Sequence, residues 1–397
     1  MLDTRFIFGS IFFVVLFGII VADLSDEWNE FKQKYNKQYK TIDEEIERKQ
    51  IFVENLNEIH SFQQNNPHAT YTLAINHLSD RRIQELVSSR RNTLKSYTSS
   101  SFESSREVKN LPESLDWRDK GVITEVYHGE VGLVVTAVVS TELVESLHAI
   151  KTGELIEGSI PQVYDCCPQP IDAFDCIKNM SGICRKEDYP KPLGRCQLDI
   201  CKPFASFDTI KRMKKPDENE MLEWIQESTL WAEMSVAGKG FNTYTGGIYD
   251  EPSCSNHSID DVVQIIGYGS EGGKPYWLCK LHWGTDWGEK GYFRIARGKN
   301  MCKIADVIIQ VANTEPSSTT QISTSTTTQL STSTTTQVST SSATQSSTSS
   351  TTQSSTSSTT QSSTSTSSAT QLYVIGSIHL MVIFVMVTIA QTILIYN

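Results

Sequence analysis

Residues 276–302 limit the fold of this chain more than any other part of its sequence. Two tryptophans stand four residues apart there, and a glycine follows each of them directly. Alternating apolar residues occur within this stretch at 292–295, and a similar run covers residues 262–266. Alternation of this kind is typical of strands. We therefore expect a β-rich unit to be built around this stretch.

The N-terminus and the cysteines indicate the secretory pathway. Residues 6–21 form an apolar run that ends at Ala22. Because this run is short and lies next to the start, we interpret residues 1–22 as a secretory signal peptide, with an N-terminal anchor as the alternative. All nine cysteines lie between Cys166 and Cys302, which in a secreted chain predicts disulfides and one thiol left over. The net charge of −11 argues against nucleic acid as a partner, because nucleic acid requires basic surfaces.

Ten residues of the 276–302 stretch match a known pattern at its spacing: Trp283, Gly284, Trp287, Gly288, Gly291, Tyr292, Arg297, Gly298, Asn300 and Cys302. The pattern is YW-x-x-KNSWG-x-x-WG-x-x-GY-x-x-x-x-RG-x-N-x-C, and through it the chain resembles the papain-like, cathepsin L-type cysteine proteases. The resemblance becomes continuous over residues 111–313. It implies an α+β fold of two lobes, one helical (111–207) and one a twisted β lobe (208–312), with a cleft between them.

Residues 23–96 resemble the helical pro-segment of the same family. Apolar residues recur there at helical spacing. The helix motif of the family is present as Glu44, Arg48, Phe52, Asn55 and Ile59, and its second motif as Ala74, Asn76, Leu78 and Asp80. Residues 97–110 are rich in serine, and we interpret them as a linker and the natural cutting point.

The residues expected to perform the chemistry are replaced. The family uses a Cys nucleophile, a His base, an Asn that orients the His, and a Gln that stabilises the oxyanion. By the resemblance, these four roles fall on Val135, Asp261, Leu281 and Gly129. A gap of one residue would move the nucleophile position to Val134, which is also aliphatic. His257 precedes the base position by four residues, and we interpret it as a surface residue. The sequence therefore predicts no catalytic residue.

The wall that would hold a substrate departs from the family as well. In the family a C-N-G-G stretch presents backbone N–H and C=O groups to the substrate as an added strand. The nearest counterpart here is residues 167–170, in which Pro168 and Pro170 have no N–H to donate. We therefore do not expect peptide binding in the usual register.

The resemblance also implies two disulfides, Cys166–Cys196 and Cys254–Cys302. A third bridge of the family has lost one half at Gly132. This loss leaves Cys167 to find a partner among Cys176, Cys184 and Cys201. We interpret Cys279 as the buried odd thiol, with a reactive thiol as the alternative.

Two further predictions concern modification and metals. Asn179 and Asn256 each begin an N-x-S sequon, which predicts glycosylation in this compartment. The cysteines and the eight histidines show no paired motifs at zinc spacing, so we expect neither a metal site nor a cofactor.

The C-terminal part of the chain is not a packed domain. Residues 314–371 repeat a glutamine every eight residues with almost only Ser and Thr between, a composition that cannot form a core. We interpret this part as an O-glycosylated stalk, with a bare linker as the alternative. Residues 372–397 are apolar and no basic residue follows them. We expect this tail to attach the chain to a membrane as the signal for a glycolipid anchor, or else as a transmembrane helix.

Taken together, these features predict an inactive homologue of the papain-like proteases at the extracellular face of a cell. Such a protein would act by binding a protein or peptide, as a decoy, a ligand or an adhesion module. An active cysteine endopeptidase is the alternative, favoured by overall resemblance alone. A third reading, inhibition of other proteases by the pro-segment, also remains open.

Overall fold

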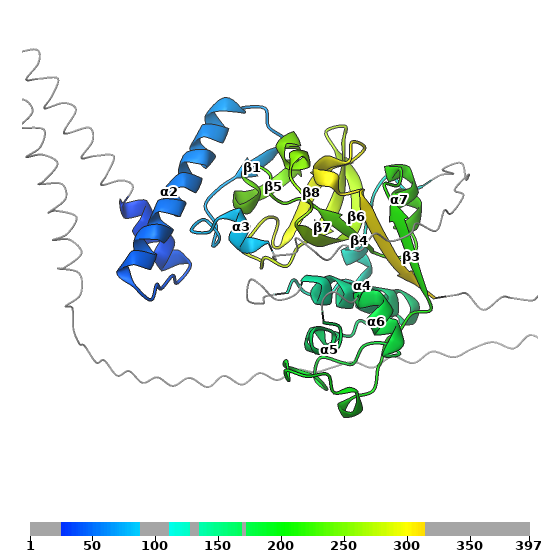
Figure 1. Ribbon diagram of the computed structural model, residues 1–397. Coiled ribbons are helices and arrows are strands. Elements are labelled where there is room, and N and C mark those ends of the chain that lie inside the picture. Colours follow the sequence, from blue (N-terminus) through cyan, green and yellow to red (C-terminus); the bar gives the residue numbers. More distant parts are fainter. Residues whose placement is uncertain (1–24, 88–110, 128–134, 169–171, 314–397) are drawn as a thin grey trace, which may run out of the picture. The chain divides into compact units, whose positions relative to one another are not determined.

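The computed structural model describes residues 25–87, 111–127, 135–168 and 172–313 (Figure 1). Residues 25–34 are helical. The following helices are α2 (Ile42–Asn65), α3 (Ile83–Leu86), α4 (Val135–Thr152), α5 (Ile160–Cys166), α6 (Ala173–Asn179) and α7 (Glu218–Trp224). The strands are β1 (Tyr71–Leu73), β2 (Leu115–Asp116), β3 (Thr209–Lys214), β4 (Leu230–Met234), β5 (Tyr244–Tyr249), β6 (Asp261–Glu271), β7 (Lys274–Lys280), β8 (Tyr292–Ala296) and β9 (Val307–Ala312).

The β lobe is one twisted sheet in the order β1-β5-β8-β7-β6-β4-β9-β3, and β2 pairs with β6. All these pairings are antiparallel except that between β5 and β8. Aromatic rings fill the interior between the sheet and its loops. The ring of Phe241 lies 5.2 Å from that of Trp287 and 5.3 Å from that of Phe293. Trp287 also donates its indole N–H to the carbonyl of Phe241 at 2.9 Å, so the core tryptophan is both buried and hydrogen-bonded.

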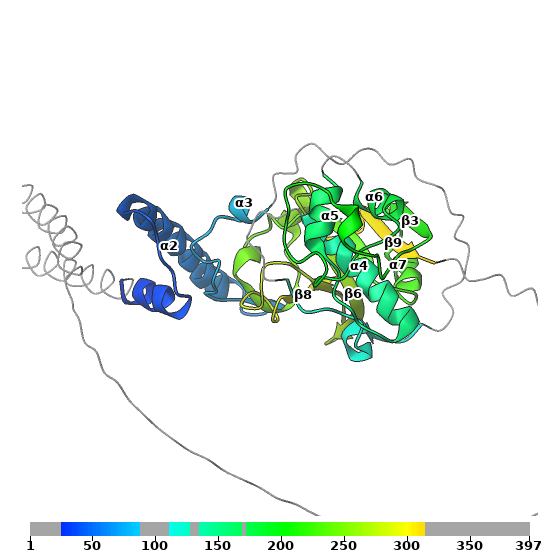
Figure 2. The same cartoon turned by 90° about the horizontal axis from the view of Figure 1, so that it is seen from below.

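The helical lobe is organised around α4, which is buried along most of its length and there carries apolar side chains together with serine, threonine and glutamate side chains. It packs on β4, β6 and β9, and α5 and α6 lie beside it. Figure 2 shows these three helices together in front of β3 and β9. A second apolar core forms here from residues such as Leu143, Phe174 and Trp231. The predicted α+β fold is thereby confirmed.

Four disulfides hold the described residues. Both bridges that the resemblance implies are present, Cys166–Cys196 and Cys254–Cys302. The open pairing is resolved as Cys167–Cys176 and Cys184–Cys201. Cys279 lies in β7 as a free and fully buried thiol, and burial raises its pKa well above the usual value. It is therefore a poor nucleophile in the folded protein.

The pro-segment has a small core of its own, and side-chain hydrogen bonds fix the turn after β1. Trp28, Phe31, Phe52 and Leu56 pack together between residues 25–34 and α2. Residues of the two pro-segment motifs then contact each other, since Asn55 donates its amide to the carbonyl of Ser79 at 2.7 Å. Asp80 accepts hydrogen bonds from Lys37 at 2.8 Å and from Tyr39 at 3.0 Å. The motif residues thus fix the turn that follows β1.

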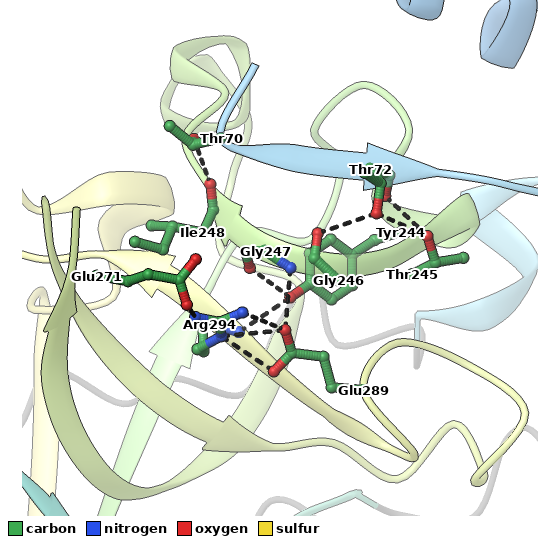
Figure 3. Close-up of polar contacts among 10 residues, drawn as sticks. All are labelled: Thr70, Thr72, Tyr244, Thr245, Gly246, Gly247, Ile248, Glu271, Glu289 and Arg294. Carbon is green, nitrogen blue, oxygen red and sulfur yellow. Dashed lines mark hydrogen bonds and ion pairs between the residues drawn. The ribbon is translucent and has the colours of Figure 1, made fainter. Parts of the chain in front are cut away.

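A short strand within the pro-segment was not expected from the sequence. Residues Tyr71–Leu73 pair antiparallel with β5 and extend the sheet at its edge. Figure 3 shows how threonines secure this edge: Thr70 donates its hydroxyl to the carbonyl of Ile248 at 2.6 Å, and Thr72 meets the hydroxyl of Thr245 at 3.0 Å. Three residues are too few to reveal an alternation in sequence. The strand forms because β5 offers it a partner.

Beneath β5, a charged pair supports the same edge. Glu289 accepts a hydrogen bond from the backbone N–H of Gly247 at 2.9 Å and another from Arg294 at 2.7 Å (Figure 3). Gly247 has φ +88°, and a Cβ at this position would lie 2.3 Å from the carbonyl oxygen of Thr70. Only glycine allows the pro-segment strand to approach β5 this closely.

Several predicted segments lie outside the described residues: the signal peptide (1–22), the linker (97–110), the stalk (314–371) and the tail (372–397). Their interpretations stay predictions. Within the residues that are described, no helix combines the length and apolar character needed to cross a bilayer.

Candidate active site

Val135, the predicted nucleophile position, is the first residue of α4. Its side chain is buried and belongs to the same apolar cluster as Val262 on β6. Gly129, the predicted oxyanion position, falls within residues 128–134, which are not described. An isopropyl group therefore stands at the start of the helix, in a packed environment and with no heteroatom to react.

Asp261, the predicted base position, begins β6. Its side chain is fully buried, and one carboxylate oxygen accepts the backbone N–H of Val262 at 2.8 Å. The other oxygen lies 4.0 Å from Nε2 of His282. The structure thus brings together a carboxylate and an imidazole.

His282 was missed by the sequence reasoning. It follows Leu281 directly, where the family pattern KNSWG has a serine and this chain reads KLHWG. The histidine at this position was visible in the pattern, but its distance from Asp261 depends on how β6 and the end of β7 lie side by side.

Leu281, the predicted orienting position, is buried in the core of the β lobe with Trp283 and Trp287. Its backbone N–H donates to the carbonyl of Gly291 at 3.0 Å. A leucine side chain can pack here but can neither donate nor accept a hydrogen bond, so it cannot orient an imidazole.

Buried charges connect the two lobes beside this position. Lys280 at the end of β7 lies 2.8 Å from Glu142 on α4, and it donates to the carbonyl of Thr124 at 2.8 Å. One helical turn along α4, Glu145 accepts hydrogen bonds from the hydroxyl of Thr124 at 2.7 Å and from the N–H of Gly158 at 2.6 Å. Burial raises the pKa of Glu145 to about 7, although Lys280 opposes this shift. Below about pH 7, Glu145 therefore keeps its proton and is neutral, and the ammonium of Lys280 is balanced by the carboxylate of Glu142.

Sequence reasoning did not single out Glu142 or Lys280. Their pairing joins residues that are far apart in the chain. Only the packing of α4 against the sheet reveals it.

The remaining predicted residues lie at the surface. His257, Asn179 and Asn256 are exposed, so both sequon asparagines are accessible to glycosylation.

Asp260, beside Asp261, accepts the N–H of Val236 at 2.8 Å. Burial raises the pKa of Asp260 to about 6, and the charge of Asp261 adds to this shift.

The structure describes only part of the predicted substrate-binding wall, residues 167–170. Pro168 is exposed, whereas Gln169 and Pro170 lie outside the described residues. Within the described residues no three His, Cys, Asp or Glu side chains gather as a metal site would require.

An open hollow of about 530 Å³ lies between β2 and strands β6 to β8, with Tyr268 in its lining. Tyr268 is seven residues along β6 from Asp261, or roughly 23 Å, so this hollow is separate from the predicted catalytic positions.

Comparisons with known proteins agree with this architecture. Residues 111–312 match the profile of the papain family cysteine proteases, and residues 28–86 match the cathepsin propeptide inhibitor domain. The chain is 32% identical over 311 residues to digestive cysteine proteinase 2 of Homarus americanus, covering 74% of this chain and 96% of the relative. It is 31% identical over 304 residues to cathepsin S of Bos taurus, covering 71% and 91%.

A solved structure gives the same picture. The digestive procathepsin L2 proteinase from the larval midgut of Tenebrio molitor aligns with a TM-score of 0.64 and 29% identity, covering 73% of this chain and 99% of that one. That protein retains its pro-segment, so the similarity extends over the pro-segment and both lobes.

Proposed function

The chain belongs to the papain family of cysteine proteases, and from that premise we propose that it is an inactive member which acts by binding a protein or peptide at the outer surface of a cell. The observation that carries this proposal is Val135. A cysteine protease needs a thiolate at the start of its central helix, and a valine there has no atom that can form a covalent bond with a substrate.

The neighbouring positions support the same conclusion. A carboxylate at Asp261 would repel a thiolate rather than stabilise it, and it lacks the paired donor and acceptor nitrogens of an imidazole. Leu281 supplies no amide to orient a base. Because each of these changes removes a different requirement of the reaction, restoring one alone would not restore activity.

Binding is the function that this scaffold can still perform. The aromatic core of the β lobe is packed, and four disulfides hold the described residues. A rigid folded unit without catalytic residues can still bind a partner, and it could therefore act as a decoy, a ligand or an adhesion module. The Ser/Thr-rich residues 314–371 and the apolar residues 372–397 support display at a membrane.

One observation favours the alternative of an active hydrolase. His282 lies 4.0 Å from Asp261, and an imidazole beside a carboxylate is the usual composition of a general base. Water could serve as the nucleophile for this pair. One experiment, described next, distinguishes this alternative from the proposed inactivity.

The experiment uses the full chain, with and without cleavage in residues 97–110. We expect no labelling by a thiol-directed epoxide and no cleavage of fluorogenic peptides, while cathepsin S under the same conditions is labelled and active. A Cys279→Ser variant serves as the control for the buried thiol. Epoxide labelling of a cleft residue, or peptide hydrolysis lost on His282→Ala, would overturn the proposal of inactivity.

Attachment is tested separately. We expect phosphatidylinositol-specific phospholipase to release the protein from intact cells, as a glycolipid anchor requires. Retention after this treatment, with release only by detergent, would replace the glycolipid anchor by a transmembrane helix.

A further inference from the structure

A group of exposed apolar side chains lies on the helical lobe, in α5 and in the segment that a disulfide ties to it. Seven large hydrophobic residues are exposed among those that the structure describes, and four of them fall between residues 164 and 200. These four are Tyr164, Leu193, Leu198 and Ile200, each with between 37% and 48% of its surface accessible. Single exposed apolar residues are ordinary, but a concentration of them marks an interaction site.

Disulfides hold these four residues around α5. Cys166 at the end of α5 is bonded to Cys196, with 4.5 Å between the Cα atoms. Tyr164 precedes the first of these cysteines by two residues, and Leu198 follows the second by two. Leu193 is tied to the same place, because its backbone N–H donates to the carboxylate of Asp165 at 2.6 Å.

The other end of the loop is also anchored. Ile200 precedes Cys201, which is bonded to Cys184. Asp165 receives a second hydrogen bond, from the hydroxyl of the buried Tyr189 at 2.8 Å. Figure 1 shows this segment as the green loops beside α5. Two disulfides and a buried tyrosine therefore present the apolar side chains on a rigid frame, which lowers the entropy lost on binding.

Three exposed cations lie in the same segment of the chain as three of these apolar residues. Lys191, Arg195 and Lys202 are exposed, and no carboxylate of the described residues lies within ion-pair distance of them. Residues 190–202 contain these three basic residues against one acidic residue, Asp199, and with Asp165 on α5 the segment still has an excess of positive charge, whereas the whole chain carries −11. We call the four apolar residues with these three cations the disulfide patch.

We propose that the disulfide patch docks a protein partner whose contacting surface has apolar side chains flanked by carboxylates. Apolar burial would supply the affinity, and the three cations would steer and orient an acidic partner. A symmetric pairing of two copies would bring together two patches that both have an excess of positive charge, so the charges argue against a homodimer through this face. This inference deepens the proposed binding function by naming where a partner binds and what its surface is like.

The test uses the full chain, solubilised in a non-ionic detergent and immobilised on a surface. A phage-displayed library of random peptides is the probe. We expect enriched peptides to combine Asp or Glu with Leu, Phe or Trp. Their Kd should rise at least tenfold for the double variant Leu198→Ser/Ile200→Ser, and should also rise between 50 and 300 mM NaCl because the cations are exposed.

The matched control makes the same change elsewhere. Ile42 and Ile46 on α2 are exposed by 72% and 57%, and the double variant Ile42→Ser/Ile46→Ser should leave the Kd unchanged. Both double variants alter exposed side chains, so their thermal unfolding should match that of the wild type and show that both are folded.

Two results would overturn the inference. Peptides that bind the Leu198→Ser/Ile200→Ser variant as tightly as the wild type would place the docking surface elsewhere. Sedimentation of the wild type as a dimer and of this variant as a monomer would make a second copy the occupant. Neither result bears on Val135, so the epoxide experiment on the cleft stays an independent test of inactivity.

Discussion

The aromatic core of the β lobe and the predicted catalytic positions differ in what they preserve, although they are neighbours in the chain. Trp283 and Trp287 keep the family pattern and pack in the core, and Trp287 has its indole N–H hydrogen-bonded. Leu281 lies only two residues before Trp283 and has lost the amide of the family pattern. Packing and chemistry are therefore constrained separately, even within one short segment.

The physical reason is that the two regions need different properties. A core position requires volume and shape, which Leu281 supplies as part of the same apolar cluster. A catalytic position requires a particular atom at a particular place, and an aliphatic side chain satisfies the packing without it. The fold can thus persist after the chemistry is lost, as we propose for this chain.

The largest effect should come from the core. Trp287→Ala removes a fully buried ring and its hydrogen bond to Phe241, and we expect the free energy of unfolding to fall by about 4 kcal/mol. Chemical denaturation monitored by circular dichroism measures this change. Trp224→Ala is the control, since this ring is only partly buried and should cost about 1 kcal/mol. Equal losses for both would contradict the central role of the 283–287 core.

A smaller effect should appear at the buried charges beside the cleft. The folded protein keeps the proton of Glu145 up to about pH 7, whereas the unfolded chain releases it near pH 4.5. Because the folded state then binds more protons in this interval, its stability falls as the pH rises from 4.5 to 7, by about 3 kcal/mol from this group. Glu145→Gln should remove this fall.

Denaturation at a series of pH values checks the expectation, with Glu154→Gln as the control because that side chain is exposed. If Glu145→Gln and the wild type lose stability in parallel over this interval, the raised pKa of Glu145 is wrong.

The next effect concerns the catalytic positions themselves. Val135→Cys alone should react slowly with iodoacetamide at pH 6, because the carboxylate of Asp261 disfavours a nearby thiolate. Adding Asp261→His should raise the rate about 10²-fold, since a thiol with a pKa near 6 is about half ionised at this pH, whereas an ordinary thiol with a pKa of about 8.5 is ionised to well under 1%. The buried Cys279 should not contribute.

The matched control for this pair is Val135→Cys with Asp261→Asn, which removes the charge without supplying an imidazole. It should react far more slowly than the histidine variant. Similar rates for all three proteins would show that positions 135 and 261 do not face each other.

The smallest effect should occur where the pro-segment joins the sheet. Gly247→Ala and Gly298→Ala both place a side chain at a left-handed φ, +88° and +92°, but only the first meets the backbone of Thr70. We expect Gly247→Ala to destabilise the protein by about 1–2 kcal/mol more than Gly298→Ala. Hydrogen exchange should show faster exchange of the β1 amides in the first variant alone. Unchanged exchange there would mean that the strand is not held by this close approach.

Sequence reasoning reached the family and the α+β fold because spaced tryptophans and glycines can be counted along the chain. The same counting assigned the nucleophile position to Val135 and the base position to Asp261, and the structure has these residues as the first of α4 and of β6. It missed β1, the pairing of His282 with Asp261, and the contact of Lys280 with Glu142. Each of these depends on two segments that are distant in sequence.

The sequence by itself determined which atoms are available: an aliphatic group at Val135, a carboxylate at Asp261, and cysteines in number sufficient for four bridges. Only the tertiary structure decided which of these atoms meet. It paired Cys167 with Cys176, buried Cys279, and gathered exposed apolar residues around Cys166–Cys196. The reason is physical, because residue type is a local property, whereas burial and contact arise only when remote segments pack together.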